Sequence, residues 1–276
     1  HPGVLPVGRN LHALDPAAVP SPAAWRRGAR AVDLLIERHR TRHGAPPRHV
    51  GLVLWGLDNI KTHGEGIAQA LHLLGVRPRA DSIGRMTRVD VVSLEELGRP
   101  RVDVTITASG IFRDIFGLHI DLLDRAVRLV ADLDEAPADN PIRARVEALV
   151  AEGFDHEEAA SRVFSNASGA YGTHIDHLVA LSRWSERGEL ADSFARRKGF
   201  VFSGGEEGKE ARGLLEALAR DIDVTVQNLD SSEVSLTDVD HYFEYLGGLT
   251  ALVEAQSGSQ PPAVVLDATS GRLRLR

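Results

Sequence analysis

The sequence contains no cysteine among its 276 residues, and this absence removes several kinds of chemistry at once. Disulfides, thiolate zinc sites, iron–sulfur clusters and a cysteine nucleophile all need thiol side chains. Long apolar runs are missing as well, because no stretch approaches the roughly 18 residues that a membrane span requires. No signal-peptide pattern opens the chain either. We therefore expect a cytoplasmic protein.

Basic residues are too few for a general nucleic-acid-binding protein. Lysine and arginine total 32 against 39 aspartate and glutamate residues, which gives a formal net charge of -7. A protein that binds nucleic acid typically carries a basic excess instead. Lysine occurs only at Lys61, Lys198 and Lys209. We attribute this scarcity mainly to base composition, and it makes each lysine somewhat more notable.

Short apolar segments alternate with helical segments along the chain. Residues 50–55 (VGLVLW) form a continuous apolar run, which is typical of a strand buried on both faces of a parallel sheet. Further strands are expected at 89–92, 102–107, 224–228 and 263–266. Strands that alternate with helices need crossover connections. The sequence therefore predicts an α/β fold, with an open, mostly parallel, Rossmann-like sheet, flanking helices and a helical insertion.

The chain has no internal repeat and no linker that clearly divides it. Residues 1–22 are rich in proline and glycine and are expected to form an extended entry segment. Residues 23–133 carry the first α/β part. Residues 134–222 are more helical and form an insertion or a subdomain in this interpretation, and residues 223–276 return to the α/β part.

Two glycine-rich segments look like nucleotide-binding motifs but lack required residues. A dinucleotide fingerprint needs glycine or alanine where this sequence has Gln69. Residues 203–210 (SGGEEGKE) lack the first glycine and the final serine or threonine of a phosphate-binding loop, and two glutamates would repel phosphate. We expect neither a nicotinamide site nor ATP hydrolysis in this chain.

Two histidine pairs have spacings that can present both imidazoles on one helix face. His39 and His43 are four residues apart and lie among arginines, which disfavours a bound cation. His174 and His177 are three residues apart and follow a glycine-rich loop. The second pair is a candidate metal-ligand pair, against the more common structural or surface role. No Gly-x-Ser-x-Gly elbow or assembled Ser/His/Asp set is present.

Polar side chains follow the strand at 50–55. Asp58, Lys61 and Glu65 come just after it, and ligands of open α/β sheets bind at the carboxyl ends of strands. These residues are therefore candidate ligand contacts. The alternative is that Asp58 or Thr62 only caps a helix.

Two further segments offer ligand contacts. Arg113 follows the strand at 102–107 and could grip a carboxylate with two nitrogens, although a surface pair with Asp114 is the alternative. Residues 165–172 (SNASGAYG) include Asn166 and Tyr171. Their small neighbours would let the backbone approach a flat ligand, and a plain flexible connection is the alternative.

An acidic segment follows the strand at 224–228. It includes Asp230, Glu233, Asp238 and Asp240, with His241 beside them. Oxygen ligands of this kind suit Mg²⁺. The alternative is that Asp238 or its neighbour caps the next helix while Glu233 is solvated.

Several of these segments together resemble one family. The large subunit of magnesium chelatase, and its relative the cobaltochelatase large subunit, carry similar blocks in the same order. The blocks are LPVGRNLHALDP (5–16), LVLWGLDNIKTHGEGIAQAL (52–71), SLEELGRPRVDV (93–104), SGIFRDIF (109–116), VFSNASGAYG (163–172) and QNLDSSEVSLTDVDHYF (227–243). The resemblance spans nearly the whole chain.

The resemblance implies a subunit that binds a tetrapyrrole and inserts a metal ion. The segment FSNASG (164–169) and the block at 227–243 resemble the magnesium branch more closely, which favours insertion of Mg²⁺ into protoporphyrin IX in (bacterio)chlorophyll biosynthesis. The compact 198–210 segment and residues 247–258 also suit the cobalt branch, which inserts Co²⁺ into a corrinoid precursor in cobalamin biosynthesis. An AAA+ ATPase subunit and an integrin-domain subunit would hydrolyse ATP as partners.

Large subunits of this family are several times longer than this chain. The family's upstream motif with a glutamate thought to be catalytic and its downstream Leu-Leu-Asn-Pro-Lys-Trp block are both absent. The chain is therefore expected to be an internal piece that is inactive alone.

The resemblance also suggests roles for the candidate residues. Expected tetrapyrrole contacts are Arg9, Asn10, Asp58, Lys61, Glu65, Arg113, Asn166 and Tyr171, with Arg9, Lys61 and Arg113 on the carboxylates. Expected metal ligands are Asp230, Glu233 and Asp238, and Glu233 and His241 are the catalytic candidates for metal guidance or proton transfer. The competing interpretations are a non-catalytic scaffold that docks the ATPase and, by fold analogy alone, an unrelated sugar- or nucleotide-binding enzyme.

Overall fold

The computed structural model describes residues 15–181, 184, 186–202, 208–229, 242–267 and 272–275. In this part of the chain, one large sheet has the strand order β10-β9-β8-β1-β4-β5-β6-β7. Its strands are β1 (His49–Leu54), β4 (Asp103–Ala108), β5 (Val163–Ser165), β6 (Phe200–Val201), β7 (Lys209–Glu210), β8 (Val224–Asn228), β9 (Ala263–Asp267) and β10 (Arg272–Leu275). The central strands β9, β8, β1, β4 and β5 are parallel, and the flanking strands pair antiparallel.

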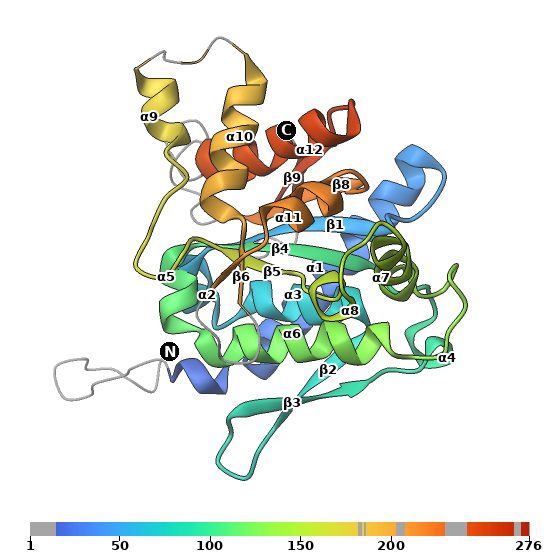
Figure 1. The fold of residues 1–276 in the computed structure, drawn as a ribbon. Helices are drawn as coiled ribbons and strands as arrows, with labels where there is room; N and C mark the ends of the chain where they lie inside the picture. The colour runs from blue at the N-terminus through green and yellow to red at the C-terminus, as the bar shows by residue number, and fades with distance from the viewer. Residues whose placement is uncertain are drawn as a thin grey trace, which may run out of the picture.

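Helices cover both faces of this sheet (Figure 1). On one face lie α1 (Pro22–His43), α3 (Glu65–Leu74) and α6 (Gly117–Ala131), and on the other lie α10 (Arg187–Lys198), α11 (Arg212–Ala219) and α12 (Gly248–Ser257). The remaining elements are η3 (Pro16–Ala18), α2 (Gly56–Thr62), α4 (Leu94–Leu97), α5 (Gly110–Ile115), α7 (Pro141–Ala151), α8 (His156–Ala159), α9 (Ile175–Ala180) and the π-helix η4 (Tyr242–Gly247).

Local sequence signals set the ends of the helices. Ser21 caps α1 and Pro22 follows it, and the helix ends at Gly44 in the left-handed conformation. Gly75, with a φ of 74°, ends α3 in the same way. None of the helices that the structure describes is long and apolar enough to cross a lipid bilayer.

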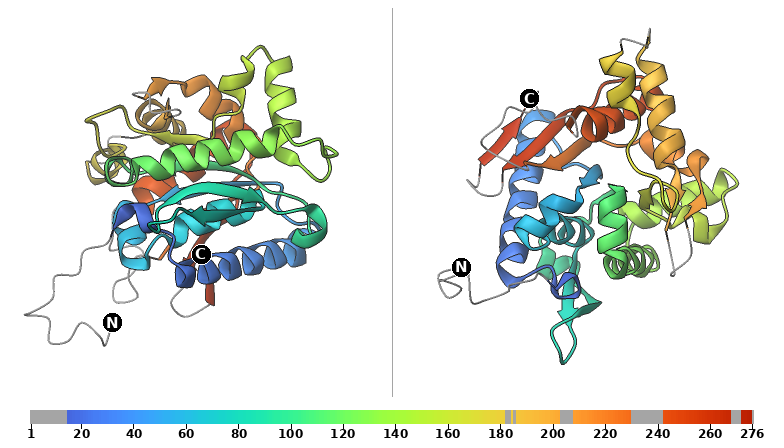
Figure 2. Two further views of the ribbon diagram at one scale, coloured as in Figure 1. Left: turned by 90° about the horizontal axis from the view of Figure 1, so that it is seen from below. Right: turned by 90° about the vertical axis from the view of Figure 1, so that its left-hand side faces the viewer.

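The predicted open α/β sheet is confirmed, and β1, β4, β8 and β9 form where strands are expected. Every residue of β1 and of β4 is buried, as a strand covered on both faces requires. The strand predicted at 89–92 is part of β3 (Met86–Val91), but β3 pairs only with β2 (Val76–Ala80) in a separate hairpin. This hairpin projects from the body of the molecule (Figures 1 and 2).

Residues 134–222 contain α7 to α11, together with three short strands. Of those strands, β5 pairs with β4, and β6 and β7 extend the main sheet beyond β5. Residues 16–18 form the short helix η3 within the expected entry segment, whose first 14 residues lie outside the described part.

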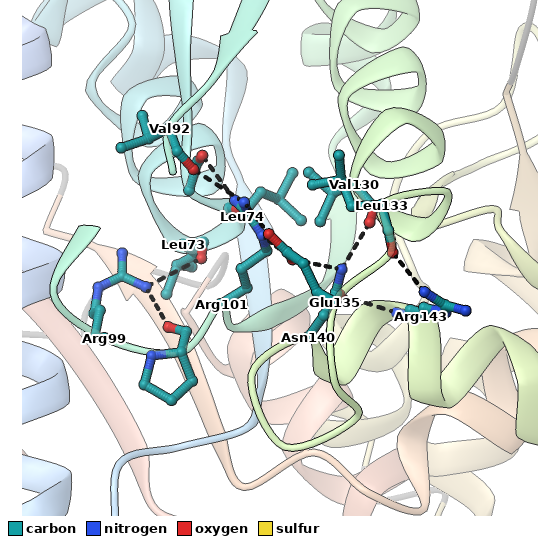
Figure 3. A network of polar contacts seen from close by, with 12 residues as sticks. Leu73, Leu74, Val92, Arg99, Arg101, Val130, Leu133, Glu135, Asn140 and Arg143 are labelled. Carbon is teal, nitrogen blue, oxygen red and sulfur yellow. Dashed lines mark hydrogen bonds and ion pairs between the residues drawn. The ribbon is translucent and has the colours of Figure 1, made fainter. Parts of the chain in front are cut away.

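A buried arginine ties the hairpin, α3 and the loop after α6 together (Figure 3). Arg101 has no exposed side-chain surface and donates to the carbonyls of Leu74, Gly75 and Val92 at 2.9–3.1 Å. Two of its nitrogens also contact Glu135, at 2.6 and 2.7 Å. Arg101 therefore satisfies carbonyls at the end of α3, which have no partner within the helix.

Candidate functional site

The candidate site lies at the carboxyl ends of β1 and β8. From β1 the chain continues to β4 and β5 on one side, and later adds β8 and β9 on the other side. The strand order therefore reverses between β1 and β8, and ligands of open α/β sheets bind in the crevice at such a point. The right-hand view of Figure 2 looks onto this edge of the sheet.

Three buried polar side chains form a hydrogen-bonded chain at this reversal point. Asn228, at the end of β8, donates from Nδ2 to Asp58 Oδ2 at 2.9 Å. Gln69 of α3 donates from Nε2 to Asn228 Oδ1 at 2.8 Å. All three residues are at most 6% exposed. An ionised carboxylate only accepts hydrogen bonds, so it fixes the orientation of both amides.

Glu65 is also buried at this edge, and α1 holds it there. Arg27 Nε lies 2.9 Å from Glu65 Oε2, and only 1% of the Glu65 side chain is exposed. The Thr62 hydroxyl accepts from the Glu65 backbone N–H at 3.2 Å and donates to the Asp58 carbonyl at 2.8 Å. The N-caps of α2 and α3 are Trp55 and Gly64, so neither Asp58 nor Thr62 is the helix N-cap of the alternative interpretation. Lys61 is exposed at the end of α2.

Arg113 uses most of its donors to hold the loop at 165–172. Its Nη1 donates to the carbonyls of Asn166, Ala167 and Ala170 at 2.7–3.1 Å. Its Nε donates to Asp114 Oδ1 at 2.7 Å, which is the pair that the alternative interpretation expects. The hydrogen bond from Arg113 lowers the pKa of Asp114. The buried Nη2 of Arg113 has no hydrogen-bond partner among the described residues.

Asn166 and Tyr171 lie at opposite ends of this loop. Asn166 is fully buried and donates from Nδ2 to the carbonyls of Gly172 and Arg197, at 2.7 and 3.1 Å. Tyr171 is 52% exposed, and its ring lies against Gly110 so closely that a Cβ there would come within 2.5 Å. The structure therefore brings Asp58, Glu65, Arg113, Asn166 and Tyr171 to the same edge of the sheet.

Lys198 is a site residue that the sequence analysis did not identify. It is fully buried, and its Nζ donates to the Ala108 carbonyl and to Asn166 Oδ1, both at 2.8 Å. The ammonium also lies 4.3 Å from the centre of the Tyr245 ring. Burial lowers the pKa of Lys198 well below its usual range, and the charge of nearby Glu244 opposes that shift. The scarcity of lysine is the one sequence signal that points to it.

Several other predicted residues belong to segments that the structure does not describe. Arg9, Asn10, Asp230, Glu233, Asp238 and His241 lie outside the described residues. The rings of His174 and His177 are 5.8 Å apart at the start of α9. In the described ranges, no group of three or more His, Asp or Glu side chains is placed to hold a metal ion.

The sequence is similar to that of known metal-chelatase subunits. The magnesium-chelatase subunit ChlH, chloroplastic, of Oryza sativa subsp. indica is 46% identical over 283 residues, which cover 100% of this chain and 20% of that protein. The aerobic cobaltochelatase subunit CobN of a Sinorhizobium species is 43% identical over 269 residues, which cover 94% of this chain and 21% of that protein. This chain thus spans about a fifth of the length of these relatives.

A solved structure shares the fold. The catalytic subunit of cobaltochelatase from Mycobacterium tuberculosis matches with a TM-score of 0.92 and 41% identity, over 98% of this chain and 23% of that one. A family model described as CobN/Magnesium Chelatase matches residues 1–276. Because that match extends over the whole sequence, the chain belongs to the CobN/magnesium chelatase family.

Proposed function

We propose that this chain forms part of the tetrapyrrole site in the large subunit of a metal chelatase that inserts Mg²⁺ into a porphyrin. The observation that carries the proposal is the buried chain of Asp58, Asn228 and Gln69 at the strand-reversal point of the sheet. Polar groups converge there in a fold whose relatives are named as chelatase subunits. The proposal concerns the full-length subunit, of which this chain would be one segment.

Chelation sets clear demands on such a site. A free-base porphyrin loses two pyrrole protons, and the nitrogen lone pairs then bind the divalent metal. A base must take the protons, and Mg²⁺ needs oxygen ligands because it releases its water reluctantly. Cationic side chains suit the porphyrin carboxylates, and apolar surface suits the macrocycle.

The residues at the carboxyl edge supply several of these chemical types. Lys61 and Arg113, with Arg9, are the proposed partners of the carboxylates. The other proposed contacts with the tetrapyrrole are Asn10, Asp58, Glu65, Asn166 and Tyr171. The acidic segment remains the proposed metal and proton-transfer region, through Asp230, Glu233, Asp238 and His241. The metal ion is a substrate in this scheme, and an AAA+ subunit and an integrin-domain subunit would supply ATP hydrolysis.

Cobalt insertion is the second candidate. It is favoured by the match in fold and sequence to a structure named as the catalytic subunit of cobaltochelatase. An assay of the assembled full-length enzyme with Mg²⁺ and protoporphyrin, and in parallel with Co²⁺ and a corrinoid precursor, separates the two. We expect turnover with magnesium, and turnover only with cobalt would contradict that choice.

A porphyrin titration tests the proposed site directly. We expect the full-length subunit, and this chain if it carries enough of the site, to bind deuteroporphyrin saturably in the micromolar range. Tryptophan quenching and a shift of the Soret band report the binding. A folded full-length subunit that does not bind would contradict the proposal. Binding by the full-length subunit alone would assign a scaffold role to this segment.

Replacing Lys198 with methionine should separate stability from binding. The variant leaves Asn166 Oδ1 without its donor, at a cost of about 1–3 kcal/mol, but it also removes a buried amino group whose desolvation is costly, which offsets that cost. We therefore expect a melting temperature near that of the wild type, together with weaker porphyrin binding. Lys198→Arg is the charge-preserving comparison. A large drop in melting temperature with unchanged affinity would instead make Lys198 a purely structural residue.

A further inference from the structure

Aliphatic side chains stay exposed beside the buried polar groups of the carboxyl edge. They are Leu57 of α2, Ile111 and Ile115 of α5, and Leu118 of α6, with exposed fractions of 43%, 36%, 37% and 58%. We call these four residues the edge face. Single exposed apolar residues are common on protein surfaces, but a group of them beside a cleft commonly marks a binding surface.

The backbone brings the helices of the edge face into contact. A Cβ on Gly56 would lie 2.7 Å from a side-chain carbon of Ile111, so the first turn of α2 packs directly on α5. The helices α5 and α6 are separated only by Phe116, which is fully buried. The right-hand view of Figure 2 shows α2 and α5 side by side at this edge.

An aromatic ring extends the same surface. Tyr171 is half exposed, and its ring lies so close to Gly110 that a side chain at that position would clash with it. Its hydroxyl donates to Asp114 Oδ2 at 2.6 Å, which fixes the ring beside the start of α5. The edge face and Tyr171 thus combine aliphatic and aromatic side chains on neighbouring elements of the carboxyl edge.

One exposed cation, Lys61, borders this surface. Lys61 lies one helical turn after Leu57 and therefore on the same face of α2. Arg113 retains one buried guanidinium nitrogen, Nη2, without a partner among the described residues. The carboxylates at this edge already have partners within the protein: Arg113 and Tyr171 bind Asp114, Asn228 binds Asp58, and Arg27 binds Glu65. Apolar side chains with an exposed cation beside them suit an apolar ring with carboxylates at its rim.

We propose that the edge face is the surface against which one face of the tetrapyrrole macrocycle lies, with the ring carboxylates directed toward Lys61. This inference rests on the proposed function. A protein partner is a poorer fit, because a stable protein interface covers about 800 Å² on each side and involves some 20–30 residues. The edge face and Tyr171 offer five residues, far fewer than such an interface uses.

The test compares two double variants of the full-length subunit in a deuteroporphyrin titration. Leu57→Ser with Leu118→Ser removes apolar contacts from the edge face. Leu129→Ser with Val150→Ser is the matched control, because Leu129 and Val150 are similarly exposed, at 40% and 41%, but lie away from this edge on α6 and α7. We expect a dissociation constant at least about tenfold higher for the first pair and within about twofold of wild type for the control.

If Leu57→Ser with Leu118→Ser folds poorly, a charge reversal at Lys61 tests the inference instead. We expect Lys61→Glu to weaken the binding of deuteroporphyrin more than that of its uncharged dimethyl ester. Equal effects on the two ligands, or equal affinities for the two double variants, would overturn the inference while the wild-type titration still supports the proposed function. Wild-type protein that binds no porphyrin overturns both. Edge-face variants that keep porphyrin affinity but lose stimulation by the ATPase partner would show a protein-docking surface instead.

Discussion

Replacing Asp103 with asparagine is expected to lower the free energy of unfolding by about 3–5 kcal/mol. Asp103 begins β4 and accepts from Arg162 Nε and Nη2 at 2.9–3.2 Å, and both side chains are at most 1% exposed. The remaining donors of Arg162 bind the carbonyls of Ala159 and Ser161. The substitution would therefore leave a buried guanidinium without its counter-charge, which is the costly way to break a buried pair.

Urea unfolding at pH 7 measures this loss, and Asp134→Asn is its matched control. Asp134 also pairs with an arginine, Arg143, at 2.8 Å, but its side chain is fully exposed. An exposed pair contributes about 0–1 kcal/mol, so the control should unfold nearly like the wild type. A loss below about 1 kcal/mol for Asp103→Asn would show that this buried pair contributes no more than an exposed one.

Asp103 should not limit stability in mild acid. Burial alone would raise its pKa, but the charge of Arg162 and the neighbouring His49 outweigh burial and hold it below its usual value. A carboxylate with a lowered folded pKa contributes stability above the unfolded pKa, and that stability is lost only as the pH falls through the folded value. For Asp103 that loss begins below about pH 4.

Because of His49, we expect the free energy of unfolding to fall at a milder pH than the one at which Asp103 acts. It is buried against Asp103 at the amino end of β1, with Nε2 2.8 Å from the Thr105 hydroxyl, and burial lowers its pKa to about 4. The unfolded chain binds a proton below about pH 6.5, but the folded chain resists it until about pH 4. The contribution of His49 to the free energy of unfolding is therefore fully present above pH 6.5. It falls by about 3 kcal/mol as the pH drops to 4.

Urea unfolding between pH 7.5 and 4.5 checks the contribution of His49. His49→Gln keeps a hydrogen-bonding group near Thr105 but cannot titrate, so its stability should change less with pH than that of the wild type. His156→Gln, at an exposed position in α8, is the control and should follow the wild-type profile. Equal pH slopes for the wild type and His49→Gln would contradict the prediction.

Sequence patterns predict the longer strands, which are rich in apolar and β-branched residues, but they do not predict the short ones. The run at 50–55 has no polar residue, and β1 accordingly sits in the centre of the sheet. By contrast, β5 and β6 contain only three and two residues, which is too short for any periodicity. The segment at 89–92 is extended as expected, but only tertiary packing decides that it pairs with β2 rather than with the main sheet.

The residues of the candidate site also fall into two groups, those that the sequence predicts and those that only the fold brings together. Asp58 and Arg113 are predictable because each follows a predicted strand, and ligands of open α/β sheets bind at the ends of such strands. Asn166 is predicted from the small residues around it instead, since β5 before it gives no pattern. Gln69 and Lys198 lie in helices, where a single polar residue gives no local signal. Gln69 contacts Asn228 across 159 positions of sequence, and Lys198 reaches Ala108 across 90. Only the folded chain brings such residues together.

The position of Asn166 between two basic residues has a mechanical consequence. Its side chain accepts from Lys198, the last residue of α10, and its backbone carbonyl accepts from Arg113 of α5. One residue therefore links the two helices through a pair of short, buried contacts. A displacement of α10 along its axis would pull on α5 and so on the edge face. This link would carry a shift of the end of α10 to the surface where the macrocycle is proposed to lie.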